Sequence, residues 1–122
     1  MTMTVAPHAE ALSRVTGERL LHDCRAAIKS SDIKPALSIE EDRAADRCIG
    51  YLQGAMDANE FWHSVDDRDH NAMKHYCINK ETSLEQVIRV LVQYLEANPK
   101  DLSETGWVCL QAAMLTSFPC QK

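Results

Sequence analysis

The segment spanning residues 82–99 constrains the fold most, because it carries the clearest helical pattern in the chain. Apolar residues recur there with a period of about 3.6, as on the buried face of an amphipathic helix. These residues are Leu84, Val87, Ile88, Leu91, Val92 and Leu95. Two overlapping capping boxes precede them, Thr82 with Glu85 and Ser83 with Gln86. The helix is expected to end at Asn98, because the residue before a proline avoids the helical region.

The rest of the chain shows the same tendency, since it has only four Gly and four Pro among 122 residues. We predict further helices over residues 9–30, over 38–58 behind a Ser38 capping box, and over 101–117. The last of these would be capped by Asp101 with Glu104. We interpret Gly50 and Gly54, four residues apart in the second helix, as positions where another helix approaches closely. The predicted fold is all-α, a single small bundle of about five helices.

Length and charge exclude several classes of protein. We assign residues 1–10 to a flexible N-terminal segment and residues 11–120 to a single helical domain.

The net charge of −5 argues against a nucleic-acid partner, which would require a basic face. No apolar run approaches the roughly 20 residues of a membrane span, so we expect no membrane partner.

Five cysteines are spread along the chain, at Cys24, Cys48, Cys77, Cys109 and Cys120. No pair has the CxxC spacing of a zinc knuckle or a redox motif. Their number favours disulfides in an oxidising compartment, with buried reduced thiols as the alternative. Residues 1–8 have no basic start followed by an apolar core, so they are not a secretory signal. Either a signal has been removed or the protein stays inside the cell.

The segment DANEFWHSVDDRD, residues 57–69, carries most of the net charge. It has five acids and one base, which sum to −4, whereas residues 1–56 sum to −1 and residues 70–122 to zero. Aromatic side chains beside acids in a predicted loop are typical of an interaction site. The alternative is a solvated acidic loop whose aromatics pack into the core. The candidate partner-binding residues are Glu60, Phe61, Trp62, His63, Asp66, Asp67, Asp69 and His70.

Histidines cluster in and after this segment, but their spacing does not indicate chemistry. The pattern His70-x4-His75-x-Cys77 matches no zinc motif, and surface histidines are the simpler interpretation. A thiolate–imidazole pair of His75 and Cys77 would need an orienting third group, and none is indicated. The chain has no Gly-rich phosphate loop and no GxSxG elbow. We therefore predict no catalytic residue, no metal and no cofactor, and a protein that is not an enzyme.

Four segments together resemble a known family. They are GERLLHDC (17–24), RCIGYLQGAMDA (47–58), YCINKETSLEQVIRVLVQYLEANPKDL (76–102) and AAMLTSFPC (112–120). Their order and spacing resemble the Rap/Tai family of type VI secretion amidase immunity proteins over about residues 17–120. One departure is Asn79, at a position where proline is common in the family.

The resemblance implies a helical periplasmic protein that binds and blocks a peptidoglycan amidase delivered by sister cells. It implies bridges Cys24–Cys48 and Cys77–Cys120, with Cys109 as the free thiol. Such an inhibitor would insert a protrusion into the active-site groove, and residues 57–75 are the candidate. The resemblance also implies a homodimer, formed by the Gly50/Gly54 face or by the fifth helix. The alternative function is a small periplasmic acid-stress chaperone, which would lose structure or dissociate at low pH and suppress aggregation.

Overall fold

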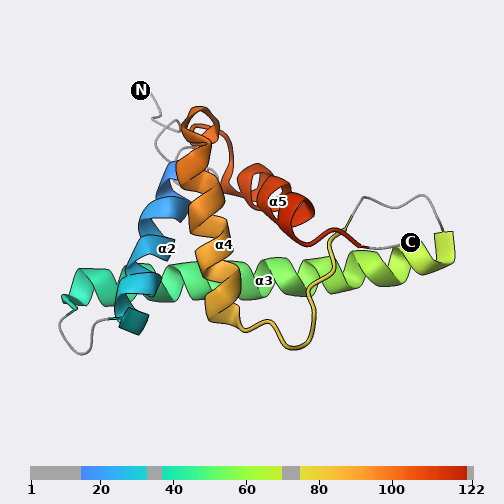
Figure 1. The fold of residues 1–122 in the computed structure, drawn as a ribbon, viewed down its shortest axis with the longest axis horizontal. Coiled ribbons are helices and arrows are strands. Elements are labelled where there is room, and N and C mark those ends of the chain that lie inside the picture. The colour runs from blue at the N-terminus through green and yellow to red at the C-terminus, as the bar shows by residue number, and fades with distance from the viewer. Residues whose placement is uncertain (1–14, 33–36, 70–74, 121–122) are drawn as a thin grey trace, which may run out of the picture.

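Four α-helices and one 3₁₀ turn form the regular structure of the described residues (Figure 1). The computed structural model describes residues 15–32, 37–69 and 75–120, with residues 66–69 described by their backbone alone. The elements are α2 (Gly17–Asp32), α3 (Ile39–Asp69), α4 (Leu84–Ala97), η1 (Pro99–Asp101) and α5 (Gly106–Ser117). The all-α prediction is confirmed, with four helices in these ranges where about five were predicted. The predicted flexible segment 1–10 lies outside the described residues.

The long helix α3 packs mainly against α2 (Figure 1). α2 packs against α3, α4 and α5, and α4 also packs against α5. The amphipathic pattern of α4 is confirmed, because five of its six apolar positions are buried and Leu84 is half-buried. Burying each such side chain stabilises the fold by about 1.5–3 kcal/mol. Among the described helices, none is long and apolar enough to cross a membrane.

Hydroxyl side chains cap the N-termini of the helices and determine where the helices begin. Ser83 and Gln86 form the capping box of α4, so this register is used rather than the overlapping one. The predicted Ser38–Glu41 box is also present at α3, with hydrogen bonds of 3.0 and 3.1 Å. The predicted cap at Asp101 is wrong, because Pro99–Asp101 forms η1 and α5 begins only at Gly106. The Thr105 hydroxyl accepts from the Val108 backbone N–H and caps α5 instead.

The helix predicted over residues 9–30 is not continuous, because Val15 and Thr16 are not helical and α2 begins at Gly17. Thr16 pairs with Thr105 in an isolated antiparallel bridge, so it cannot belong to the helix. Its hydroxyl accepts from the Arg19 backbone N–H at 3.2 Å, which caps the start of α2. Residues 9–14 of the predicted helix lie outside the described part of the chain.

The predicted end of the second helix near Asn59 is also wrong, since α3 continues to Asp69. Residues 57–69 contain no glycine or proline that would break a helix. Asn59 commonly favours helix ends because its amide competes for the local backbone. Here that amide instead bonds the backbone of Tyr76, far along the chain. The predicted acidic loop is therefore the second half of a long helix.

Close packing against glycine occurs at Gly17 and Gly106, and not at Gly50 and Gly54 as predicted. A Cβ atom at Gly50 or Gly54 would meet nothing within 4 Å, so the close-approach interpretation is wrong for both. A Cβ at Gly17 would lie 2.6 Å from Cys109 Sγ and 3.2 Å from Leu102 Cα. A Cβ at Gly106 would lie 3.2 Å from the Tyr51 hydroxyl. Periodicity locates a glycine on a helix but does not identify what faces it.

These contacts predict that alanine at Gly17 and alanine at Gly54 change the stability of the protein in opposite directions. Gly17→Ala is expected to destabilise the protein by about 1–3 kcal/mol, because the new methyl group overlaps the buried Cys109 side chain and nearby backbone. Gly54→Ala is the matched control, because a Cβ there meets nothing within 4 Å, and it is expected to stabilise the monomer by about 0.5–1 kcal/mol through helix propensity. Urea unfolding of both variants measures the difference. Equal effects of the two substitutions would contradict this account of the Gly17 contact.

Candidate functional site

The C-terminal half of α3 extends beyond α4 and α5 (Figure 1). Asp57, Glu60 and Ser64 are exposed there, and the Phe61 side chain is 58% exposed. Phe61 packs edge-to-face on Trp62, with ring centroids 5.2 Å apart. Trp62 is half-buried. The aromatics therefore do not fold fully into the core, and this end of α3 presents an apolar anchor among acids.

The opposite face of the same helical segment is fixed to residues 75–78. Asn59 and His63 lie four residues apart, so their side chains share one face of α3. The Asn59 amide donates to the Tyr76 carbonyl at 2.8 Å and accepts from the Tyr76 backbone N–H at 3.0 Å. His63 Nε2 lies 3.1 Å from the same carbonyl. Asn59 and His63 of α3 thus lie at hydrogen-bonding distance from the backbone groups of Tyr76.

Tyr76 anchors this extended segment in the core. Its side chain is 1% exposed, and its hydroxyl lies 3.4 Å from the Ala55 carbonyl. Burial raises the pKa of Tyr76 to about 12, so the phenol stays neutral. The Cys77 backbone N–H donates to the Phe118 carbonyl at 2.8 Å, and the Cys77–Cys120 bridge joins the same two segments. The end of α3, residues 76–77 and residues 118–120 therefore form one fixed unit.

Residues predicted for partner binding divide into three groups. Glu60, Phe61 and Trp62 lie on the extended half of α3, and His63 lies on the face of that half that contacts Tyr76. Asp66, Asp67 and Asp69 belong to its last turn, but their side chains are outside what the structure describes. His70 also lies outside the described residues. A groove of about 410 Å³ lies beside this end of α3, lined by residues that include Glu60, His63, Cys77 and Lys80.

Sequence spacing missed the histidine pair at this site. The rings of His63 and His75 lie with centroids 3.6 Å apart, and His63 Nε2 is 3.5 Å from Cys77 Sγ. His63 is a helix residue and His75 is extended, so only the tertiary fold brings them together. The role of Asn59 was missed for the same reason.

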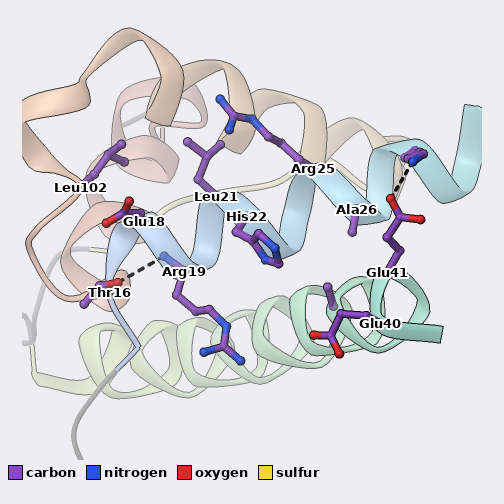
Figure 2. Close-up of a pocket in the computed structure, with 12 residues that line it drawn as sticks. Thr16, Glu18, Arg19, Leu21, His22, Arg25, Ala26, Glu40, Glu41 and Leu102 are labelled. Atoms are coloured by element: carbon purple, nitrogen blue, oxygen red, sulfur yellow. Dashed lines mark hydrogen bonds and ion pairs between the residues drawn. The ribbon is translucent and has the colours of Figure 1, made fainter. Parts of the chain in front are cut away.

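A second hollow, of about 770 Å³, lies between α2 and the start of α3. Figure 2 shows Arg19, His22 and Arg25 on α2, with Glu40 and Glu41 on α3. Lys29 Nζ donates to a Glu41 carboxylate oxygen at 2.6 Å across this hollow. The basic side chains of this hollow lie on α2 and most of its acidic ones at the start of α3, so it does not select a ligand of one charge.

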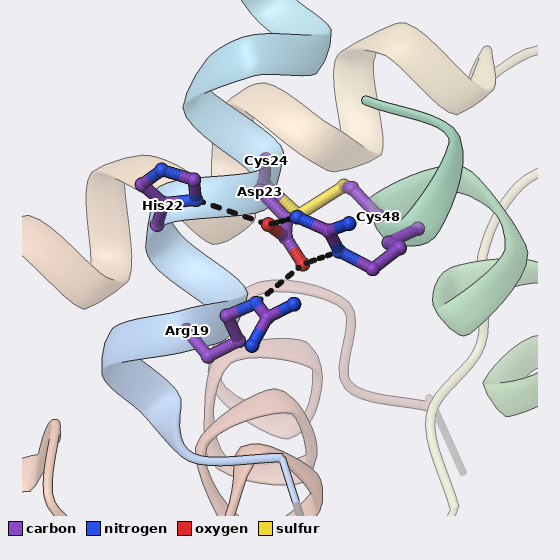
Figure 3. The surroundings of a disulfide bond; sticks show 6 residues. Arg19, His22, Asp23, Cys24 and Cys48 are labelled. Carbon is purple, nitrogen blue, oxygen red and sulfur yellow. Dashed lines mark hydrogen bonds and ion pairs between the residues drawn. A yellow bond between two sulfur atoms is a disulfide. The ribbon is translucent and has the colours of Figure 1, made fainter. Parts of the chain in front are cut away.

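A buried carboxylate lies beside the Cys24–Cys48 bridge (Figure 3). Asp23 is 4% exposed and accepts two hydrogen bonds of 3.1 Å from the Arg47 guanidinium. His22 Nδ1 lies 3.0 Å from the same carboxylate. Burial alone would raise the pKa of Asp23, but Arg47, His22 and Arg19 together hold it below its usual value. This network joins α2 to α3 and has a structural role.

Both bridges implied by the resemblance are present. Cys24–Cys48 joins α2 to α3 with Cα atoms 5.0 Å apart, and Cys77–Cys120 has Cα atoms 4.9 Å apart. Cys109 is free and buried, and its thiol donates to the Asp101 carbonyl at 3.2 Å. Burial raises the pKa of the Cys109 thiol, and the charges of Asp101 and Glu104 add to the effect.

A family model described as Rap1a immunity proteins matches residues 16–120. The chain belongs to the Rap1a immunity protein family. The match covers all four described helices and all four bridged cysteines. As a Rap1a immunity protein, the chain is not an enzyme. No curated protein and no solved structure matches it significantly.

Proposed function

We propose that this Rap1a immunity protein neutralises a cognate type VI secreted peptidoglycan amidase by occluding its active-site groove with the extended end of α3. The observation that carries the proposal is the exposure of Phe61 on a helical segment that extends beyond α4 and α5. An inhibitor of this kind requires no chemistry of its own. It requires a shaped surface that fills the groove and excludes the substrate from it.

The composition of this surface suits a groove with a catalytic Cys–His pair. Asp57 and Glu60 are exposed beside Phe61, and three further acids follow in the last turn of α3. Acidic groups complement a histidinium or other basic groups of such a groove and accelerate association. The opposite face of the segment is held by Asn59 and the Cys77–Cys120 bridge. This rigidity limits the entropy that is lost on binding.

The two bridges support a periplasmic location for this action, because disulfides persist in oxidising compartments. We also propose that the protein forms a homodimer through the open helix face at Gly50 and Gly54. Sedimentation equilibrium tests this part separately. A monomer mass at micromolar concentration would contradict the dimer and leave the inhibitory role intact.

Binding to the amidase encoded beside this protein tests the function directly. The two purified proteins are mixed, their affinity is measured, and peptidoglycan digestion is followed. We expect nanomolar affinity and loss of digestion. Binding that leaves digestion intact would contradict occlusion of the groove. Absence of binding would contradict the pairing itself.

Neutralising the last turn of α3 is expected to slow association. In the variant Asp66→Asn/Asp67→Asn/Asp69→Asn, the association rate with the amidase should fall about tenfold or more at low salt, because electrostatic steering is lost. The salt dependence of that rate should weaken with it. Stopped-flow mixing at several ionic strengths measures both.

A control with the same change in net charge separates a local effect from a global one. Asp42, Asp46 and Glu104 are exposed and lie away from the end of α3, so Asp42→Asn/Asp46→Asn/Glu104→Gln suits this purpose. The control should retain most of the wild-type rate. Equal rates for both triple variants would overturn the electrostatic part of the proposal.

A further inference from the structure

Four potential metal ligands converge behind the extended half of α3. They are His63, His75, Cys77 and Cys120, and their ligand atoms all lie within 4.8 Å of one another. His63 comes from α3, while His75 and Cys77 flank Tyr76 and Cys120 follows α5. In the oxidised protein the two sulfurs are bonded to each other. Two imidazoles therefore lie directly against a disulfide.

The sulfur–nitrogen distances in this cluster are close to those of a tetrahedral zinc site. Zinc–sulfur bonds of about 2.3 Å and zinc–nitrogen bonds of about 2.0 Å at tetrahedral angles place sulfur and nitrogen ligands about 3.5 Å apart. His63 Nε2 lies 3.5 Å from Cys77 Sγ and 4.0 Å from Cys120 Sγ. The His63 and His75 rings are in contact, with centroids 3.6 Å apart, so the rings would turn apart to direct one nitrogen each at the ion. A set of two sulfur and two nitrogen donors is typical of zinc.

We propose that reduction of the Cys77–Cys120 bridge converts this cluster into a Cys₂His₂ zinc site. A dithiol reductant transfers two electrons and two protons to the bridge, which yields two thiols and the disulfide of the reductant. Zn²⁺ then binds both sulfurs and one nitrogen of each neutral histidine, and the two thiol protons pass to solvent. The oxidised protein does not bind the ion there, because its sulfurs carry no thiolate charge.

The surrounding hydrogen bonds permit this exchange. His63 Nε2 would turn from the Tyr76 carbonyl toward the metal, and the Asn59 amide would still donate to that carbonyl at 2.8 Å. The zinc ion would then join the same segments that the disulfide joins. The end of α3 thus keeps its attachment under reducing as well as oxidising conditions.

The other cysteines in the described residues do not form a comparable set. Cys24 and Cys48 have His22 nearby, but its Nδ1 lies 3.0 Å from the Asp23 carboxylate. Cys109 is buried alone and donates to a backbone carbonyl. Zinc binding is therefore expected at one position and with one ion per chain.

Titration of the reduced protein with Co²⁺ and then Zn²⁺ tests the proposal. A water-soluble phosphine serves as reductant, because it delivers the same two electrons, leaves as its oxide with the oxygen of water, and competes weakly for zinc. We expect the visible absorption of tetrahedral Co²⁺ and a thiolate-to-cobalt charge-transfer band, both lost when one equivalent of Zn²⁺ is added. The oxidised protein should show neither band. Absence of these bands in the reduced protein would overturn the proposal.

Three variants locate the ion. His63→Ala should lower the affinity for Zn²⁺ more than about 100-fold, beyond the range typical of losing an outer-sphere contact. Cys77→Ser/Cys120→Ser should abolish the bands, whereas His22→Asn should leave them unchanged. Circular dichroism is recorded throughout. If the reduced metal-free chain unfolds, recovery of helix on adding Zn²⁺ supports the proposal only where it requires His63, and recovery in His63→Ala overturns it.

Discussion

Replacing Phe61 by alanine is expected to weaken binding to the cognate amidase by about 30-fold or more. Aromatic anchors at the centre of an interface typically contribute at least about 2 kcal/mol, which is a factor of about 30 in Kd. Phe61 is 58% exposed in the free protein, and its aromatic contact is the edge-to-face one with Trp62. Its removal should therefore leave the free energy of unfolding almost unchanged. Calorimetry or surface plasmon resonance measures the affinity.

Ile39 provides the matched control for this prediction. It is 72% exposed, it is also a large apolar residue, and it occupies the first position of the same helix. Ile39→Ala removes exposed apolar surface at the opposite end of α3 and should leave the affinity within about threefold of wild type. If Phe61→Ala bound as tightly as Ile39→Ala, the extended end of α3 would not be the binding surface.

Replacing Arg47 by alanine is expected to destabilise the fold by about 1.5–3 kcal/mol. The substitution leaves the Asp23 carboxylate buried without its two guanidinium hydrogen bonds. Hydrogen bonds to a charged group contribute about 1.5–3 kcal/mol. The loss stays in this range because the Arg47 side chain is 38% exposed and Arg19 and His22 still lie at the Asp23 carboxylate. Arg25→Ala is the control, since its pair with Glu96 is exposed and should contribute less than about 1 kcal/mol. Urea unfolding at neutral pH compares the two.

The pH dependence of this deficit follows from the lowered pKa of Asp23. A carboxyl group whose pKa is lower in the folded state stabilises the fold above its unfolded value of about 3.9. That contribution is lost as the pH falls through the folded pKa. The difference between wild type and Arg47→Ala should therefore be full at pH 7 and shrink below about pH 4. A difference that stayed constant in this range would contradict the assignment to Asp23 ionisation.

Apolar periodicity and capping boxes predicted the helices correctly where only residues within one helix are involved. The period of α4 and its Ser83–Gln86 box depend on residues three or four apart, and both are present. The Ser38 box of α3 is present for the same reason. The two bridges became predictable only through the family resemblance, because cysteine spacing alone allows many pairings.

The errors arose where distant segments determine the structure. Asparagine often ends helices, but the side-chain amide of Asn59 is hydrogen-bonded to the Tyr76 backbone, and α3 continues past it. Gly17 and Gly106 are tightly packed by residues from distant parts of the chain, whereas Gly50 and Gly54 face open space. His63 and Cys120 are 57 residues apart in sequence, so no local spacing could indicate that their side chains meet.

The attachment of α3 to residues 118–120 also sets an order in which the molecule matures. A chain that emerges N-terminus first completes α3 long before Phe118 and Cys120 are available to hold Tyr76 and Cys77 against it. The Cys24–Cys48 bridge can close much earlier, because its partners are only 24 residues apart. The surface that we propose for amidase binding would therefore take its final form last. A partly emerged chain would have its first bridge closed before that surface is complete.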